Sequence, residues 1–157
     1  MTEVRCRRIE LTTEIPATPE QCFELSLSVD AHRSSMSDSG ERAVAGVTSG
    51  VMRLGDSVTW KARHFGLPVT MTSVISVYDA PHLFVDEQQS GPFRRWWHEH
   101  RFEPTAGGTL MTDVVEFEAP FGVVGRLANV LVLTRYMTKL LARRNAWLRD
   151  ALSNPEE

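Results

Sequence analysis

Three histidines and two acidic residues stand in segments where they could do chemistry together. His98 and His100 are two residues apart, Asp113 follows in the next extended segment, and His64 and Glu87 lie in earlier ones. A histidine beside a carboxylate can take up and release protons near neutral pH, because the unperturbed imidazole pKa is about 6.5. In this interpretation His100 is a base oriented by Asp113, and His64 or Glu87 is the acid.

The same histidine pair also allows a metal-ligand interpretation. Side chains two residues apart on a strand share one face and lie about 6.5–7 Å apart along the chain. His98 and His100 could therefore share an ion, with Asp113 or His64 as a third ligand and an open coordination position, as in catalytic sites. His-x-His is a short and common pattern, and no other residues show ligand spacing. We therefore expect no metal and no cofactor.

Turn signals divide the middle of the chain into the strands that must position these residues. The alternating segment 4–15 predicts a first strand, and residues 41–119 predict six more, joined as consecutive hairpins. The five turn signals are Leu54-Gly55-Asp56, Gly66-Leu67-Pro68, Asp79-Ala80-Pro81, Ser90-Gly91-Pro92 and Ala106-Gly107-Gly108.

Helical patterns lie on either side of the six strands. Thr18-Pro19-Glu20 is typical of a helix start, with a side-chain cap followed by proline. A second short helical turn is expected within residues 30–39. Apolar residues recur at helical spacing near the C-terminus and predict one long amphipathic helix from about Val124 to Leu152. Only this helix is long enough to cover the apolar face of a seven-stranded sheet.

Alternation along the predicted strands indicates which side chains face inward. Met111, Val115 and Phe117 are apolar and alternate with polar neighbours, so their face points inward together with Asp113. Either two-residue turn within Ala106-Gly107-Gly108 pairs odd with even positions across the hairpin. The residues that then share the inner face are Trp96, His98, His100 and Phe102, with His100 near Asp113.

The earlier hairpins are treated in the same way. A turn at Gly66-Leu67 places Trp60 and His64 on the face of Met71, and this face is apolar enough to be the inner one. The segment 83–89 is ambiguous, since one turn geometry points Glu87 inward and the other points Asp86 and Gln88 inward. We favour Glu87, because Leu83 and Val85 then also face the core.

Several short stretches resemble a known superfamily. They are Ala45-Gly46-Val47 to Gly50, Leu54 to Trp60, Arg63-His64-Phe65-Gly66, Asp86-Glu87-Gln88, Gly91-Pro92-Phe93, and Trp96 to Phe102 with His98 and His100. Together with the order of elements, they resemble a bacterial ligand-binding branch of the START-like (SRPBCC) proteins, which are related to the birch pollen allergen and to polyketide cyclases. The resemblance covers nearly the whole chain. It implies the α+β helix-grip fold, a seven-stranded curved antiparallel sheet wrapped around a long C-terminal helix, with two short helices between strands 1 and 2.

Composition limits the class of protein. The chain has 157 residues, 42% of them hydrophobic and 24% charged, and a net charge of −3, which argues against a nucleic-acid partner. No apolar run reaches the length of a membrane span, and the N-terminus lacks the apolar core of a signal peptide. We expect one cytoplasmic domain over residues 1–157, a monomer or homodimer without stable membrane insertion.

These observations lead to a functional hypothesis. Buried polar side chains are costly unless they have partners, so a polar set on an inner face indicates a lined cavity. We expect a small hydrophobic or amphipathic ligand, such as a lipid, polyketide or aromatic metabolite. The alternatives are a cyclase or dehydratase that uses a His/Asp acid–base pair, and an interaction module without a ligand. The expected ligand-binding residues are Trp60, His64, Met71, Glu87, Trp96, His98, His100, Asp113 and Phe117, with His100 and Asp113 as catalytic candidates.

Overall fold

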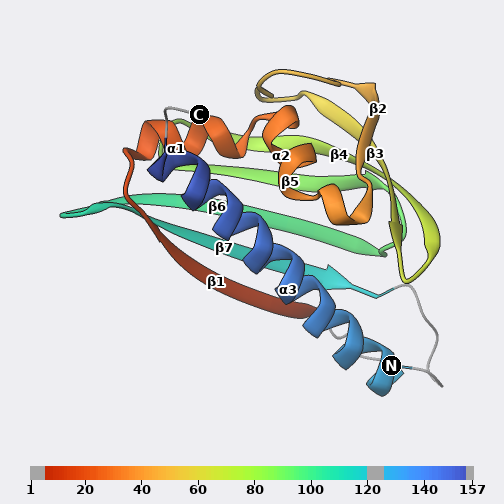
Figure 1. Cartoon of the computed structure of the whole chain (residues 1–157). Coiled ribbons are helices and arrows are strands. Elements are labelled where there is room, and N and C mark those ends of the chain that lie inside the picture. Colours follow the sequence, from red (N-terminus) through yellow and green to blue (C-terminus); the bar gives the residue numbers. More distant parts are fainter. Residues whose placement is uncertain (1–5, 120–125, 155–157) are drawn as a thin grey trace.

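The computed structural model describes residues 6–119 and 126–154, and it shows one curved antiparallel sheet with helices on its inner side (Figure 1). The seven strands lie in the order β1-β7-β6-β5-β4-β3-β2. In chain order the elements are β1 (Arg7–Ile15), α1 (Pro19–Ser26), α2 (Val29–Ser35), the short 3₁₀ turn η1 (Ser37–Ser39), β2 (Arg42–Gly46), β3 (Ser57–His64), β4 (Leu67–Asp79), β5 (Leu83–Ser90), β6 (Arg95–Thr105), β7 (Gly108–Glu118) and α3 (Arg126–Ser153).

This architecture confirms the predicted helix-grip fold. The long helix α3 crosses the inner side of the sheet, and α1 and α2 lie on that same side and contact it (Figure 1). The predicted helix start at Val124 and the first two residues of the predicted first strand lie outside the described residues. Within the described part of the chain, no helix is long and apolar enough to cross a membrane.

Local chemistry explains the start of α1. The Thr18 hydroxyl accepts a hydrogen bond from the Gln21 backbone N–H at 3.2 Å, and the Gln21 side chain accepts one from the Thr18 N–H at 3.0 Å. Pro19 follows at the first helical position, as predicted. This capping box satisfies two backbone donors that the first turn would otherwise leave free.

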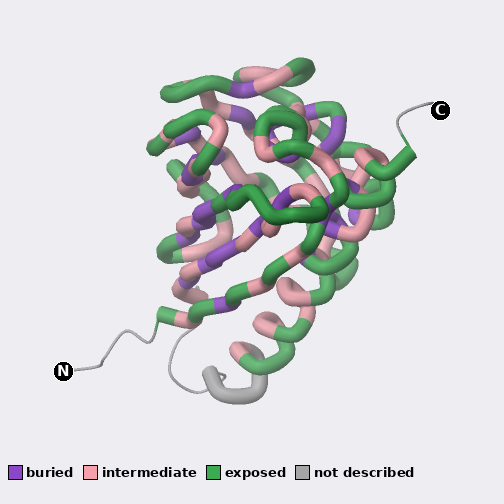
Figure 2. The backbone as a smooth tube through the Cα atoms, turned by 90° about the vertical axis from the view of Figure 1, so that its left-hand side faces the viewer, coloured by how far each residue is buried: buried purple, intermediate pink, exposed green. Residues whose placement is uncertain are grey.

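Apolar side chains form two groups on the inner side of the sheet. One centres on Phe23 of α1, whose ring meets Tyr78, Phe84 and Phe102 edge-on at 5.3–5.5 Å. The other contains Trp96, Phe117 and Leu141. Along β6, His98 and His100 stand between Trp96 of one group and Phe102 of the other. Figure 2 shows that buried positions alternate with more exposed ones along the strands.

The predicted faces of the first long hairpin are correct, although its register differs. The two-residue turn is Phe65-Gly66, since His64 pairs with Leu67 and Trp60 with Met71. The register is thus shifted by two residues from a Gly66-Leu67 turn, and a shift of two keeps every side chain on its predicted face.

The preference for Glu87 is wrong, because β5 points Asp86 inward. Asp86 pairs with His98 across β5 and β6, and Glu87 therefore faces the opposite side. Neither connection of β5 is a two-residue turn: Asp79 pairs with Leu83 at one end, and a longer loop follows Ser90 at the other. In addition, an irregularity in β4 between Ile75 and Val77 shifts the pairing of β4 with β5 by one residue.

The side chain of Gln88 organises the loop after β5. Its Nε2 donates to the Phe93 carbonyl at 2.8 Å, and its Oε1 accepts from the Phe93 N–H at 3.2 Å. The Gln88 side chain thus provides the hydrogen-bond partners that a neighbouring strand would otherwise provide for the Phe93 backbone. Because this loop leads into β6, Gln88 helps to hold the two strands that carry Asp86 and His98.

We expect Gln88→Ala to destabilise the protein by about 1–3 kcal/mol, because two partly buried backbone groups lose their partner. Urea unfolding followed by circular dichroism measures this change. The matched control is Gln89→Ala, since Gln89 is exposed on the other face of the same strand. Equal unfolding midpoints for the two variants would contradict the proposed role of the Gln88 amide.

Candidate functional site

A cavity of about 520 Å³ lies between the inner face of the sheet and α3. Most of its lining is apolar, and β3, β4 and α3 supply half of the lining residues. Of the residues predicted from the sequence to bind a ligand, those that line it are Trp60, His64, Met71, Trp96, His98 and His100. Asp113 and Phe117 are fully buried behind the lining, and Glu87 lies on the opposite face of the sheet.

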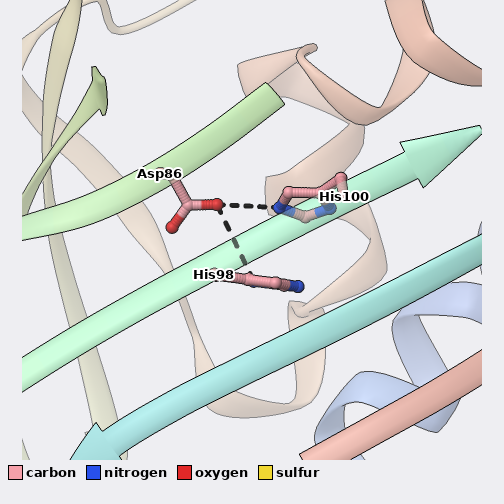
Figure 3. A group of neighbouring side chains, drawn as sticks. All are labelled: Asp86, His98 and His100. Carbon is pink, nitrogen blue, oxygen red and sulfur yellow. Dashed lines mark hydrogen bonds and ion pairs between the residues drawn. The ribbon is translucent and has the colours of Figure 1, made fainter. Parts of the chain in front are cut away.

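Three side chains form the polar floor of this cavity, and we call Asp86, His98 and His100 the floor cluster (Figure 3). His100 Nε2 lies 2.8 Å from Asp86 Oδ2, and His98 Nδ1 lies 3.7 Å from the same oxygen. The two imidazole rings stack with their centroids 3.7 Å apart, and the Phe84 ring also stacks on His100, with a centroid distance of 4.1 Å. Both histidines are almost fully buried.

Asp113 lies behind the floor cluster and is completely buried. Its Oδ1 accepts a hydrogen bond from His98 Nε2 at 2.9 Å and lies 3.0 Å from His100 Nδ1. The predicted proximity of His100 and Asp113 is confirmed, since the two residues are directly paired between β6 and β7. The well-directed hydrogen bond of His100 goes to Asp86 instead.

The helix α3 supplies two further partners of Asp113. Asn145 Nδ2 donates to Asp113 Oδ2 at 2.7 Å, and it also lies 3.2 Å from the Thr13 hydroxyl of β1. Arg144 Nη1 lies 3.5 Å from Asp113 Oδ1. The two neighbouring arginines differ, since Arg143 is exposed whereas Arg144 is only 6% exposed.

The surroundings of the two carboxylates lower their pKa values. Burial by itself would raise the pKa of Asp86, but the hydrogen bond from His100 and the nearby positive charges outweigh it and bring the pKa to about 2. The pKa of Asp113 lies well below its ordinary value for the same reasons, with hydrogen bonds from both histidines. Burial, with a further contribution from His100, lowers the pKa of His98. Both carboxylates are therefore ionised at neutral pH.

A second polar group lines the cavity nearer its opening, and we call Glu41, His32, His64 and Tyr136 the rim cluster. His64 Nδ1 lies 2.6 Å from the Tyr136 hydroxyl, and His32 Nε2 lies 2.5 Å from Glu41 Oε2. Burial lowers the pKa of His64, although Glu41 opposes this change. His64 therefore belongs with Tyr136 and Glu41, and it does not join His98 and His100 as an acid or as a metal ligand.

Sequence reasoning missed three important residues of this site, namely Arg144, Asn145 and Tyr136, and it named Asp86 only as the alternative to Glu87. One available signal was the spacing of Arg144, which stands three residues after Leu141 and four before Leu148 on the apolar face of the helix. A charged residue at such a position needs a buried partner of opposite charge.

The arrangement allows two kinds of chemistry. A histidine held between two carboxylates can transfer a proton to or from a molecule in the cavity. The three donors of the floor cluster could instead coordinate a cation, because their ligand atoms lie within 4.8 Å of one another. In both cases the reacting group would sit beneath a mostly apolar chamber.

The comparisons with known proteins agree with the fold described above. The sequence model of a family described as polyketide cyclase/dehydrase and lipid transport matches residues 7–153. Similar solved structures include TTHA0849 from Thermus thermophilus, with a TM-score of 0.76 and 19% identity over 98% of this chain and 100% of that one. The Zhui aromatase/cyclase from Streptomyces sp. R1128 has a TM-score of 0.78 and 13% identity over 98% and 97%. The ginseng major latex-like protein 151 from Panax ginseng has a TM-score of 0.66 and 15% identity over 94% and 97%. No curated protein sequence matches the chain significantly.

We expect acid to weaken the protein partly through Asp86. Its folded pKa of about 2 lies below the ordinary value of 3.8, so its stabilising contribution is complete above about pH 4 and is lost as the pH falls towards 2. The loss amounts to about 2 kcal/mol. Urea unfolding of the natural protein and of Asp86→Asn from pH 5 down to about pH 2 measures it, with Asp79→Asn as an exposed-carboxylate control. Parallel pH curves for the natural protein and Asp86→Asn would contradict this expectation.

Proposed function

Because the chain belongs to the polyketide cyclase/dehydrase and lipid transport family, we propose that it binds a small hydrophobic or amphipathic molecule in the cavity between the sheet and α3. A lipid, a polyketide or an aromatic metabolite fits this description. The observation that supports the proposal is the cavity itself, whose volume of about 520 Å³ falls in the range of roughly 300–1,000 Å³ found for small-molecule sites. A cavity of this size favours a ligand over a ligand-free interaction module.

The distribution of polarity in the cavity favours an amphipathic ligand. Trp60, Met71 and Trp96 offer apolar contact area, while the floor and rim clusters provide separate sets of hydrogen-bonding groups. A purely apolar ligand would leave the buried polar groups of the floor without new partners. We therefore propose that His98 and His100 orient a carbonyl, hydroxyl or carboxylate group of the ligand, while His64 contacts a second polar group nearer the rim.

Large apolar side chains mark the entrance. Phe65, Leu67 and Val132 line the cavity, yet they are 60%, 65% and 55% exposed. Phe65 lies in the β3–β4 turn, Leu67 begins β4, and Val132 lies in α3, so separate elements contribute these side chains. Exposed apolar side chains that adjoin a cavity are typical of the surface over which a hydrophobic ligand enters.

We expect Ala62→Phe to weaken ligand binding at least tenfold, because Ala62 lines the cavity and a phenyl ring there would occupy part of its volume. Titration with the fluorescent apolar probe 1-anilinonaphthalene-8-sulfonate, together with native mass spectrometry of the purified protein, measures the change. The matched control is Arg63→Phe, which adds the same ring to the exposed face of the same strand. Equal probe affinity in both variants would contradict binding in this cavity.

A second candidate function is supported by the floor cluster. His100 lies between Asp86 and Asp113, with its ring nitrogens 2.8 Å and 3.0 Å from their oxygens. A ring placed between two carboxylates suits proton transfer, which is the requirement of enolisation, aldol closure and dehydration of a poly-β-ketone. We propose His100 as the proton carrier of such a cyclase or dehydratase reaction, with Asp113 holding the ring in place.

This candidate makes its own prediction. We expect His100→Gln to reduce turnover of a poly-β-ketone thioester at least a hundredfold, because the glutamine amide cannot carry the proton. Liquid chromatography with mass detection of the cyclised product measures turnover. Undiminished cyclisation by His100→Gln would remove the proton-transfer role and leave ligand binding as the proposed function.

A further inference from the structure

Three potential metal ligands meet at the floor of the cavity. The ligand atoms that Asp86, His98 and His100 can offer lie within 4.8 Å of one another (Figure 3). His98 Nδ1 and His100 Nε2 both face the same oxygen, Asp86 Oδ2, at 3.7 Å and 2.8 Å. A transition metal about 2.0–2.2 Å from each donor needs donors roughly 3–4 Å apart, so small side-chain rotations suffice to form the site.

Asp113 holds both histidines in the orientation that metal ligands require. Metal-bound histidines commonly donate their second ring N–H to a carboxylate, which fixes the ring and leaves the other nitrogen free for the metal. His98 does this through Nε2, which lies 2.9 Å from Asp113 Oδ1. His100 Nδ1 lies 3.0 Å from the same oxygen and has no well-directed hydrogen bond within the described part of the chain. Rotating that ring slightly would align the second N–H with Asp113.

This arrangement leaves an electrostatic conflict that a cation would remove. If both histidines donate to Asp113, their remaining ring nitrogens carry lone pairs that point at the Asp86 carboxylate. A neutral imidazole carries one ring proton, so at least one of the two His100 contacts, to Asp86 or to Asp113, then lacks a proton between nitrogen and oxygen. Arg144 offsets only one of the two carboxylates. The donor atoms of the floor cluster are close enough to bind a cation, and Arg144 alone does not balance the negative charge of Asp86 and Asp113.

We propose that Asp86, His98 and His100 bind one divalent first-row transition-metal ion, with its open coordination positions facing the cavity. Two imidazoles and one carboxylate suit Zn²⁺, Co²⁺ or Fe²⁺, whereas Mg²⁺ and Ca²⁺ favour sites made of oxygen donors. The open positions would accept an oxygen atom of the cavity ligand. The site goes beyond the proposed ligand binding, and in the metal-loaded protein both histidines are ligands, so it replaces the proton-carrier role of His100.

The experiment uses metal ions alone as probes. Protein freed of metal by dialysis against a chelator is titrated with Co²⁺ by visible absorption and with Zn²⁺ by calorimetry, in a Cys6→Ser background because Cys6 is an exposed thiol. We expect one ion per chain and displacement of Co²⁺ by Zn²⁺. Asp86→Asn and His98→Gln should each weaken binding at least about a hundredfold. His82→Gln, which removes an exposed histidine outside the cavity, should change affinity less than twofold.

The outcomes separate the metal site from the proposed function. Urea unfolding midpoints identify variants that have lost their fold, and Asp86→Asn preserves side-chain size, so it remains informative if His98→Gln is unstable. A metal-free protein that binds neither ion, or variants that bind as tightly as the natural protein, would overturn the metal site. Binding of 1-anilinonaphthalene-8-sulfonate by the metal-free protein would in that case still support the ligand cavity. Anomalous scattering from a Co²⁺-soaked crystal with a peak between the three side chains would support the site directly.

Discussion

The structure depends on the neutralisation of one fully buried carboxylate, that of Asp113. An ionised carboxylate in the interior costs several kcal/mol unless charged and polar partners replace the lost water. These partners come from two elements: His98 from β6, and Arg144 and Asn145 from α3. Asn145 is in turn bonded to Thr13 of β1. The carboxylate therefore links the sheet to the helix that it grips and determines how far along α3 the sheet must pack. A helix shifted by one turn would leave the charge unpaired.

Much of this fold could be predicted because its hairpins are local. The turn at Ala106-Gly107 joins β6 to β7 with two residues, and that alone places His98, His100 and Asp113 on one face. The same argument failed for β5, whose orientation depends on an irregularity in β4 and on the Gln88 side chain that closes its loop. Such features depend on tertiary contacts, and a pattern of alternating residues does not contain them.

The contribution of α3 to the site was harder to predict for a different reason. Periodicity shows which face of a helix is buried, but it does not show which strand residue meets a given helix position. Arg144 looked like part of a basic surface because it follows exposed Arg143, yet it lies on the apolar face with Leu141 and Leu148. Asn145 and Tyr136 gave no signal in the sequence, since either residue type is equally at home on a helix surface. Their roles follow from the approach of the helix to Asp113 and to the rim.

The separation of structural and cavity-facing groups explains how one cluster can serve both stability and chemistry. Asp113 and Asn145 are 0% and 2% exposed and hold the fold together, whereas Asp86 has an exposed edge and lines the cavity. Arg144 does both, since it contacts Asp113 and also lines the cavity. With neutral histidines, the two carboxylates and Arg144 leave a net charge of −1 at the floor. A divalent ion would leave a net charge of +1, which an anionic oxygen of the ligand, such as a carboxylate or enolate, would offset. With such an ion bound, the charge at the floor favours a ligand whose polar end carries oxygen, and the apolar walls above it favour the rest of that molecule being hydrophobic.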